Sequence, residues 1–121
     1  MKRSAAFLAA LLFAATANAA ATRAQDPIGT DGDKYAILFE NARVRVLEYR
    51  DIPGDKTLEH AHPAFVLYAL APFERQIHLP DGKTLQRAFK AGEVLWSEAQ
   101  THIGENVGDT PTHVIIVELK E

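Results

Sequence analysis

The chain has 121 residues, with 13 Lys and Arg against 16 Asp and Glu, five His and no Cys. This length allows one small domain. The net charge of −3 argues against a nucleic-acid binder that works through a basic patch. The absence of Cys excludes disulfides, thiolate metal sites and a Cys nucleophile. A metal in this protein would therefore need His, carboxylate, amide or water ligands.

Residues 1–19 have the three-part pattern of a secretory signal peptide. Lys2 and Arg3 are followed by an apolar run over residues 5–15 and then by Ala17-Asn18-Ala19, a small-x-small cleavage site. The run is shorter than the ~20 residues that a transmembrane helix needs. We therefore predict cleavage, a periplasmic location and no membrane association afterwards. The alternatives are an uncleaved N-terminal anchor and secretion in place of periplasmic retention.

Residues 20–34 contain Ala, Thr, Gly, Asp and Pro without an apolar period, and we interpret them as a flexible leader. From residue 35 on, short apolar or alternating runs of strand length are separated by turn signals such as Pro80-Asp81-Gly82. The expected strands are residues 35–39, 44–49, 65–71, 75–79, 84–89, 94–96, 102–106 and 113–119. Their rhythm predicts one all-β domain, a sandwich, barrel or jelly roll, over residues 35–121.

Three of the five histidines have a spacing that suits metal binding. His60 and His62 are two positions apart, so on extended backbone they point to the same face. His102 is the candidate for a third ligand from another strand, which would leave open coordination positions for water or substrate. The alternative for each is an ordinary histidine at a strand end that forms local hydrogen bonds.

The surrounding residues strengthen this interpretation. Gly54 precedes His60-Ala61-His62 in a G-x5-H-x-H pattern, and Gly92 precedes His102, with Asn106 four residues after that histidine. These two blocks resemble the two motifs of the cupin superfamily. The frame Glu40-Asn41-x-Arg43-Val44-Arg45-Val46 and the later Gly108-Asp109-Thr110-Pro111 are similar to those of small single-domain bacterial cupins.

The resemblance implies a double-stranded β-helix, the cupin jelly-roll barrel, with His60, His62 and His102 as metal ligands. Two departures from the family pattern stand out. No Glu follows His62 at positions 65–67, and the Pro-x-Gly before the third His is absent. The implied site is then a neutral three-His site, similar to that of thiol dioxygenases. Such a site suits Fe(II), and with less selectivity Zn, Ni, Cu or Mn.

Phe65, Leu67, Tyr68 and Trp96 are the expected substrate-binding residues, because their strands flank the histidines. We expect a metal-dependent, dioxygenase-like oxidoreductase that acts on a small organic molecule, with catalytic residues unassigned. The alternative is a binding barrel without metal, which the missing Glu motivates. A homodimer is a further expectation, with residues 35–39 and 113–119 as the edges that could pair. Arg45 is expected to face solvent.

Overall fold

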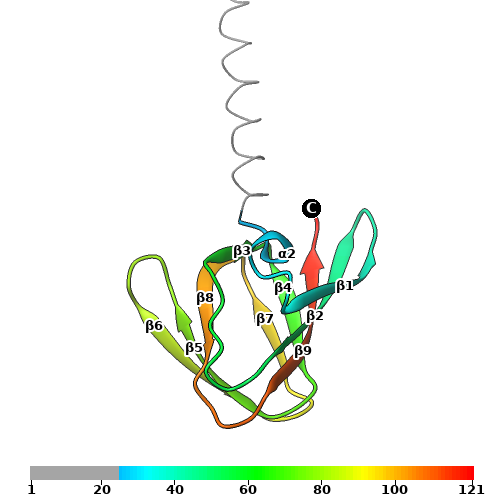
Figure 1. Cartoon of the computed structure of the whole chain (residues 1–121). Helices are drawn as coiled ribbons and strands as arrows, with labels where there is room; N and C mark the ends of the chain where they lie inside the picture. The colour runs from blue at the N-terminus through cyan, green and yellow to red at the C-terminus, as the bar shows by residue number, and fades with distance from the viewer. Residues whose placement is uncertain (1–24) are drawn as a thin grey trace, which may run out of the picture.

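Over the part of the chain that the computed structural model describes, residues 25–121, nine strands form two antiparallel sheets (Figure 1). The predicted signal peptide and residues 20–24 lie outside this range. The elements are α2 (Pro27–Thr30), β1 (Tyr35–Glu40), β2 (Val44–Asp51), β3 (His60–His62), β4 (Phe65–Ala69), β5 (Phe73–His78), β6 (Thr84–Phe89), β7 (Val94–Ser97), β8 (Gln100–Asn106) and β9 (Thr112–Leu119).

The five-stranded sheet has the order β1-β2-β9-β4-β7, and the four-stranded sheet has the order β3-β8-β5-β6. Neighbours in each sheet that are far apart in sequence, such as β2 and β9, give the chain the topology of a double-stranded β-helix. The fold is therefore the all-β jelly-roll barrel expected from the sequence.

The core follows from the period-two alternation of the strands. In β9, Thr112, Val114, Ile116 and Glu118 are buried, and the residues between them are less so. Leu47 in β2 is fully buried against the same interior. Burying a side chain of this size stabilises the fold by ~2 kcal/mol. The same alternation places two polar side chains, Thr112 and Glu118, inside the barrel.

Two of the predicted turns require glycine. Gly54 has φ +90° and Gly82 has φ +87°, a left-handed region that L residues with a Cβ rarely adopt. Gly54 belongs to the first histidine motif, and its amide donates to the Asn106 carbonyl at 3.0 Å. This glycine therefore fixes the path of the loop that leads from β2 to β3.

The sequence analysis placed the start of regular structure at residue 35, but the structure has a helical turn, α2, before that residue. Asp26 caps α2 by accepting a 2.9 Å hydrogen bond from the Ile28 amide, and Pro27 occupies the first turn. The Ala61 amide donates to the Gln25 carbonyl at 2.8 Å, which holds this segment against β3. A single helical turn shows no apolar period, so the pattern search overlooked it. Residues 25–34 are thus part of the domain and not a leader.

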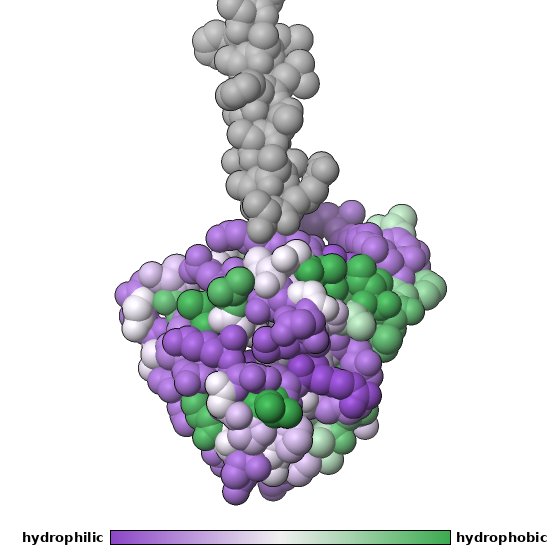
Figure 2. All heavy atoms as spheres, in the orientation of Figure 1, coloured by the Kyte–Doolittle hydropathy of each residue, from purple (hydrophilic) through white to green (hydrophobic). Residues whose placement is uncertain are grey.

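The expectation about sheet edges needs one correction. β9 lies in the middle of its sheet, paired to β2 on one side and β4 on the other, so residues 113–119 are not an edge. β1 does lie at an edge, and it exposes Ile37, Leu38 and Phe39. Figure 2 shows hydrophobic surface gathered over this part of the molecule. Among residues 25–121, no helix is both long and apolar enough to cross a membrane.

A candidate metal centre

The structure brings together the three histidines singled out from the sequence. His60 and His62 lie on β3, and His102 on β8 is the direct cross-strand partner of His60. All three are buried, and one ligand nitrogen from each lies within 4.8 Å of the others. The ring centroids of His60 and His102 are 4.8 Å apart, and those of His62 and His102 are 5.3 Å apart. This group could hold a metal ion.

Each imidazole uses its Nδ1 for a hydrogen bond that points away from the cluster. The acceptors are the Leu58 carbonyl for His60 at 2.9 Å, Glu118 Oε2 for His62 at 2.6 Å and Gln100 Oε1 for His102 at 2.6 Å. Because all three partners are acceptors, Nδ1 carries the proton in every ring. The Nε2 lone pairs remain for a metal. Outer partners of this kind orient metal-binding histidines and raise their basicity.

Two of the rings stay neutral well below pH 7. Burial, followed by the nearby His62, lowers the pKa of His60 to about 4. Burial together with both other histidines lowers the pKa of His102 to about 2. Protons therefore compete weakly for the nitrogens that a cation would use.

Although no Glu stands at positions 65–67, a carboxylate from elsewhere in the chain, Glu118, contacts His62 at Nδ1 and is not a member of the three-His group. Its Oε1 accepts from Arg45 Nη2 at 2.7 Å, and Arg45 Nη2 also contacts Asp26 Oδ2 at 2.9 Å. A chain of charges thus runs from the start of α2 through Arg45 and Glu118 to His62. Arg45 is consequently half-buried and paired, and the expectation that it faces solvent was wrong.

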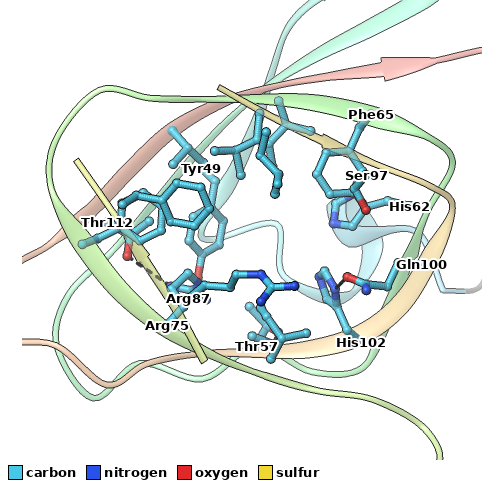
Figure 3. A pocket seen from close by; sticks show the side chains of 18 of the residues that line it. Tyr49, Thr57, His62, Phe65, Arg75, Arg87, Ser97, Gln100, His102 and Thr112 are labelled. Atoms are coloured by element: carbon cyan, nitrogen blue, oxygen red, sulfur yellow. Dashed lines mark hydrogen bonds between the residues drawn. The ribbon is translucent and has the colours of Figure 1, made fainter. Parts of the chain in front are cut away.

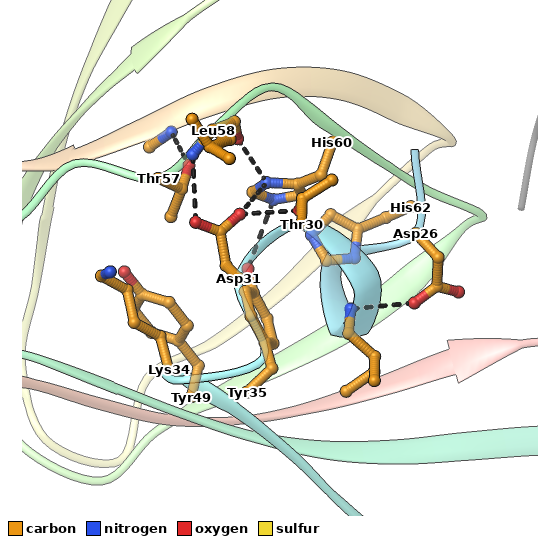
Figure 4. Close-up of polar contacts among 12 residues, drawn as sticks. Asp26, Thr30, Asp31, Lys34, Tyr35, Tyr49, Thr57, Leu58, His60 and His62 are labelled. Carbon is orange, nitrogen blue, oxygen red and sulfur yellow. Dashed lines mark hydrogen bonds and ion pairs between the residues drawn. The ribbon is translucent and has the colours of Figure 1, made fainter. Parts of the chain in front are cut away.

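Asp31, in the segment before β1, and Tyr35, the first residue of β1, supply two further contacts to His60 (Figure 4). Asp31 is buried, accepts from the Leu58 amide at 3.0 Å, and places Oδ2 3.5 Å from His60 Nδ1. The Tyr35 hydroxyl lies 3.3 Å from His60 Nε2. Since Nδ1 of this ring carries the proton, Tyr35 donates to Nε2, and this hydrogen bond would break when a metal takes the same lone pair. Burial raises the pKa of Tyr35, which keeps it a phenol.

A cavity of about 140 Å³ opens beside the histidines (Figure 3). Its walls are mostly apolar and include Phe65, Leu67, Leu85, Leu95, Val114 and Ile116. Of the four residues expected to bind substrate, Phe65, Leu67 and Trp96 line this cavity. Trp96 stands at the rim with 51% of its surface exposed, and its Nε1 donates to Glu98 Oε1 at 3.1 Å.

Tyr68 does not line the cavity, which corrects the fourth assignment. Successive residues of a strand face opposite sides. Phe65, Leu67 and Ala69 of β4 therefore turn inward, while Tyr68 turns outward and is 44% exposed.

The sequence analysis missed a buried polar network at the far side of the cavity. Arg75 Nη1 donates to Asp51 Oδ2 at 2.7 Å and to Thr112 Oγ1 at 3.1 Å, and its Nη2 donates to the Tyr49 hydroxyl at 3.2 Å. Asn106 donates to Asp51 Oδ1 at 3.0 Å. Asn106 of the second motif thus serves this network and also donates to the Thr110 carbonyl at 3.0 Å. The inward alternation of Phe73, Arg75 and Ile77 in β5 was the signal that could have located Arg75.

The two remaining histidines lie outside the cavity. His78 Nε2 pairs with Glu105 Oε1 at 2.9 Å, and His113 Nε2 pairs with Glu48 Oε2 at 2.9 Å. Neither residue lines the cavity or belongs to the three-His group.

Comparison with known proteins supports the cupin superfamily through structure. No protein-family model matches the sequence, and no curated protein matches it closely. A cupin domain from Bordetella pertussis Tohama I is 25% identical, with a TM-score of 0.66, over 72% of this chain and 92% of that one. A protein with a double-stranded β-helix domain from Klebsiella pneumoniae is 22% identical, with a TM-score of 0.56, over 69% of this chain and 68% of that one. A predicted oxalate decarboxylase from Thermotoga maritima is 24% identical, with a TM-score of 0.53, over 72% and 79%.

Proposed function

We propose that this protein is a metal-dependent cupin in which His60, His62 and His102 hold a divalent transition metal. The observation that carries the proposal is the convergence of three buried imidazoles, each oriented by its own acceptor at Nδ1. Three neutral nitrogen donors fit Fe(II), Zn, Ni, Cu or Mn, and we favour Fe(II).

The function that we infer is a dioxygenase-like oxidoreductase acting on a small organic molecule. A bound Fe(II) would supply the redox chemistry with O₂. The residues of the chain provide the setting for that chemistry. The apolar walls around Phe65 and Leu67 exclude bulk water and bind the organic part of the substrate. The Tyr35 hydroxyl, next to His60 Nε2, can donate a hydrogen bond to a group bound there.

The reaction class rests on the donor set and not on the fold. One structural neighbour is described as a predicted oxalate decarboxylase and another, from Streptomyces resistomycificus, as a polyketide cyclase. One barrel therefore appears in proteins of different described activity. A three-His site without a carboxylate ligand is similar to that of thiol dioxygenases, and this similarity is why we favour the oxidoreductase.

The test is elemental analysis of the mature protein, purified without a histidine tag, beside a His60→Ala/His62→Ala double variant. Near-stoichiometric iron or another transition metal in the wild type, lost in the variant, is the expected result. His78→Ala is the matched control, because His78 pairs with Glu105 away from the cavity. Absence of metal after anaerobic reconstitution with Fe(II) would refute the proposal.

A second candidate, a small-molecule-binding barrel without metal, is favoured by one observation. The acidic side chain nearest to His62, Glu118, already pairs with Arg45 and is not free to become a ligand. Saturable binding of a small molecule by protein that takes up no metal would select this function.

We further infer export to the periplasm, with cleavage after Ala19, from the signal pattern of residues 1–19. N-terminal sequencing of the protein from a periplasmic extract should begin at Ala20. Recovery of the uncleaved chain in the membrane fraction would favour an N-terminal anchor instead.

A further inference from the structure

The cavity beside the histidines has an excess of positive charge. Its lining contains two arginines, Arg75 and Arg87, and no Asp or Glu. The two residues are direct cross-strand partners on β5 and β6. Like charges directly opposite each other destabilise a sheet, so this pairing calls for a compensating negative charge.

Only one of the two arginines is compensated within the described residues. Asp51 neutralises Arg75, whose Nη1 lies 2.7 Å from Oδ2. Arg87 forms no ion pair among residues 25–121, and its hydrogen bond is to the carbonyl of the preceding residue, Gln86, at 3.3 Å. Arg87 is also exposed, so it stands where the cavity meets solvent. Its guanidinium remains charged at every physiological pH and has donors free for an incoming anion.

The other residues of the cavity indicate what kind of molecule carries the anionic group. Near Arg87, Phe73 and Phe89 stack with ring centroids 4.6 Å apart, and Ile77 and Leu85 extend the apolar wall. The volume of about 140 Å³ is close to the ~150 Å³ of an apolar protein cavity that binds benzene. In Figure 3 an arginine side chain extends from the side of the cavity that carries the labels Arg75 and Arg87 toward His102, which lies on the other side with His62.

We propose that the ligand of this cavity is a small organic monocarboxylate with an apolar body about the size of one ring. Its carboxylate binds the guanidinium of Arg87, whose planar fork matches two carboxylate oxygens. Its body lies among the apolar side chains and reaches toward the histidines. The proposal rests on the proposed function only in taking this cavity as the substrate site.

The experiment is calorimetric titration of the mature protein with benzoate and, as an uncharged probe of the same shape, benzamide. Metal-free and metal-loaded protein are both titrated. Arg87→Gln removes the charge at the cavity. Arg43→Gln is the matched control, because Arg43 is exposed in the turn between β1 and β2 and does not line the cavity. The melting temperature of each variant shows that it is folded.

We expect wild-type protein to bind benzoate at least tenfold more tightly than benzamide, even without metal. Arg87→Gln should remove this preference and leave benzamide binding unchanged, whereas Arg43→Gln should change benzoate binding less than twofold. Arg87→Lys, which keeps the charge but not the fork, should retain part of the preference.

Equal affinity for the two probes, the same benzoate affinity in Arg87→Gln, or no benzoate binding at all would overturn the inference. These failures are separable from failure of the metal proposal. Metal that depends on the histidines, without any effect of Arg87, leaves the metal site standing and removes the anion site. Benzoate binding that depends on Arg87, in protein that takes up no metal, leaves the anion site standing and removes the metal site.

Discussion

At the scale of single residues, the candidate centre depends on what lies behind each histidine. Donor atoms of the right type are common on protein surfaces, but His60, His62 and His102 are buried and each has an acceptor at Nδ1. The acceptors differ: a backbone carbonyl, a carboxylate and an amide. Glu118 is the carboxylate among the three acceptors, and a carboxylate behind a metal-binding imidazole commonly tunes metal affinity.

Glu118→Gln should weaken metal binding about 10- to 100-fold, because the neutral amide polarises His62 less than the carboxylate does. Competition with a chelator for Zn(II) or Co(II) measures this change. Glu105→Gln is the matched control, since Glu105 pairs with His78 outside the cavity. Unchanged affinity in Glu118→Gln would show that this carboxylate does not act on the site.

The lowered pKa values of His60 and His102 predict how the stability of the metal-free protein depends on pH. The unfolded chain binds protons at these histidines below pH ~6.5, whereas the folded protein resists them until about pH 4 and about pH 2. The free energy of unfolding is therefore greatest above pH ~6.5. It should fall as the pH drops from there, by ~1.4 kcal/mol per pH unit for each such histidine.

Urea unfolding between pH 7.5 and pH 4.5 measures this slope. His102→Asn should flatten it, because the variant has lost one of the two buried neutral rings. His113→Asn is the control for loss of a histidine outside the cavity, where His113 pairs with Glu48. The same slope in the wild type and in His102→Asn would contradict a lowered pKa for His102.

At the scale of elements, the segment before β1 is a part of the site. Asp31 follows α2 and holds the Leu58 amide two residues before His60, and Tyr35 opens β1 with its hydroxyl on the same histidine. Asp26 reaches His62 through Arg45 and Glu118. A segment of about ten residues thus fixes two of the three candidate ligands from outside their own sheet.

Asp31→Ala should destabilise the protein by ~1–3 kcal/mol, because it removes a buried carboxylate that accepts from the partly buried Leu58 amide. Asp33→Ala, two residues away, should change stability by no more than ~0.5 kcal/mol, since Asp33 is exposed and its carboxylate forms a surface ion pair with Lys34. Chemical denaturation of both variants provides the comparison. Equal free energies of unfolding for the two variants would show that the segment before β1 does not stabilise the barrel.

At the scale of the whole molecule, one edge of the five-stranded sheet exposes three consecutive apolar side chains. β1 pairs with β2 along one side only, its other side is a free edge of the sheet, and it exposes Ile37, Leu38 and Phe39. Unpaired apolar edges favour pairing with another strand, and natural proteins usually protect them. A second copy of the same chain is the partner that we predict for it.

Leu38→Lys should shift the protein from dimer to monomer in sedimentation at micromolar concentration, because a charge on the edge opposes strand pairing. Val94→Lys is the control, since Val94 is an equally exposed apolar residue on the opposite edge strand, β7. A wild-type protein that sediments as a monomer would refute the prediction.

The sequence by itself determined the features that depend on local spacing. Alternation along strands identified an all-β chain, the turn at Gly54 was recognisable from Pro53-Gly54, and His60 and His62 had to share a face. Alternation also places Phe65 and Leu67 on one side of β4, although the sequence analysis assigned Tyr68 to the same side. The helical turn at Pro27 escaped because one turn is shorter than any detectable period.

Only the tertiary structure decided which strands meet. His102 lies opposite His60 because β3 pairs with β8. Glu118 reaches His62 because β9 crosses to the centre of the other sheet. Contacts between residues 40 or more positions apart depend on the order of strands in the sheets. That order is set by burial of the whole core, which no local pattern encodes.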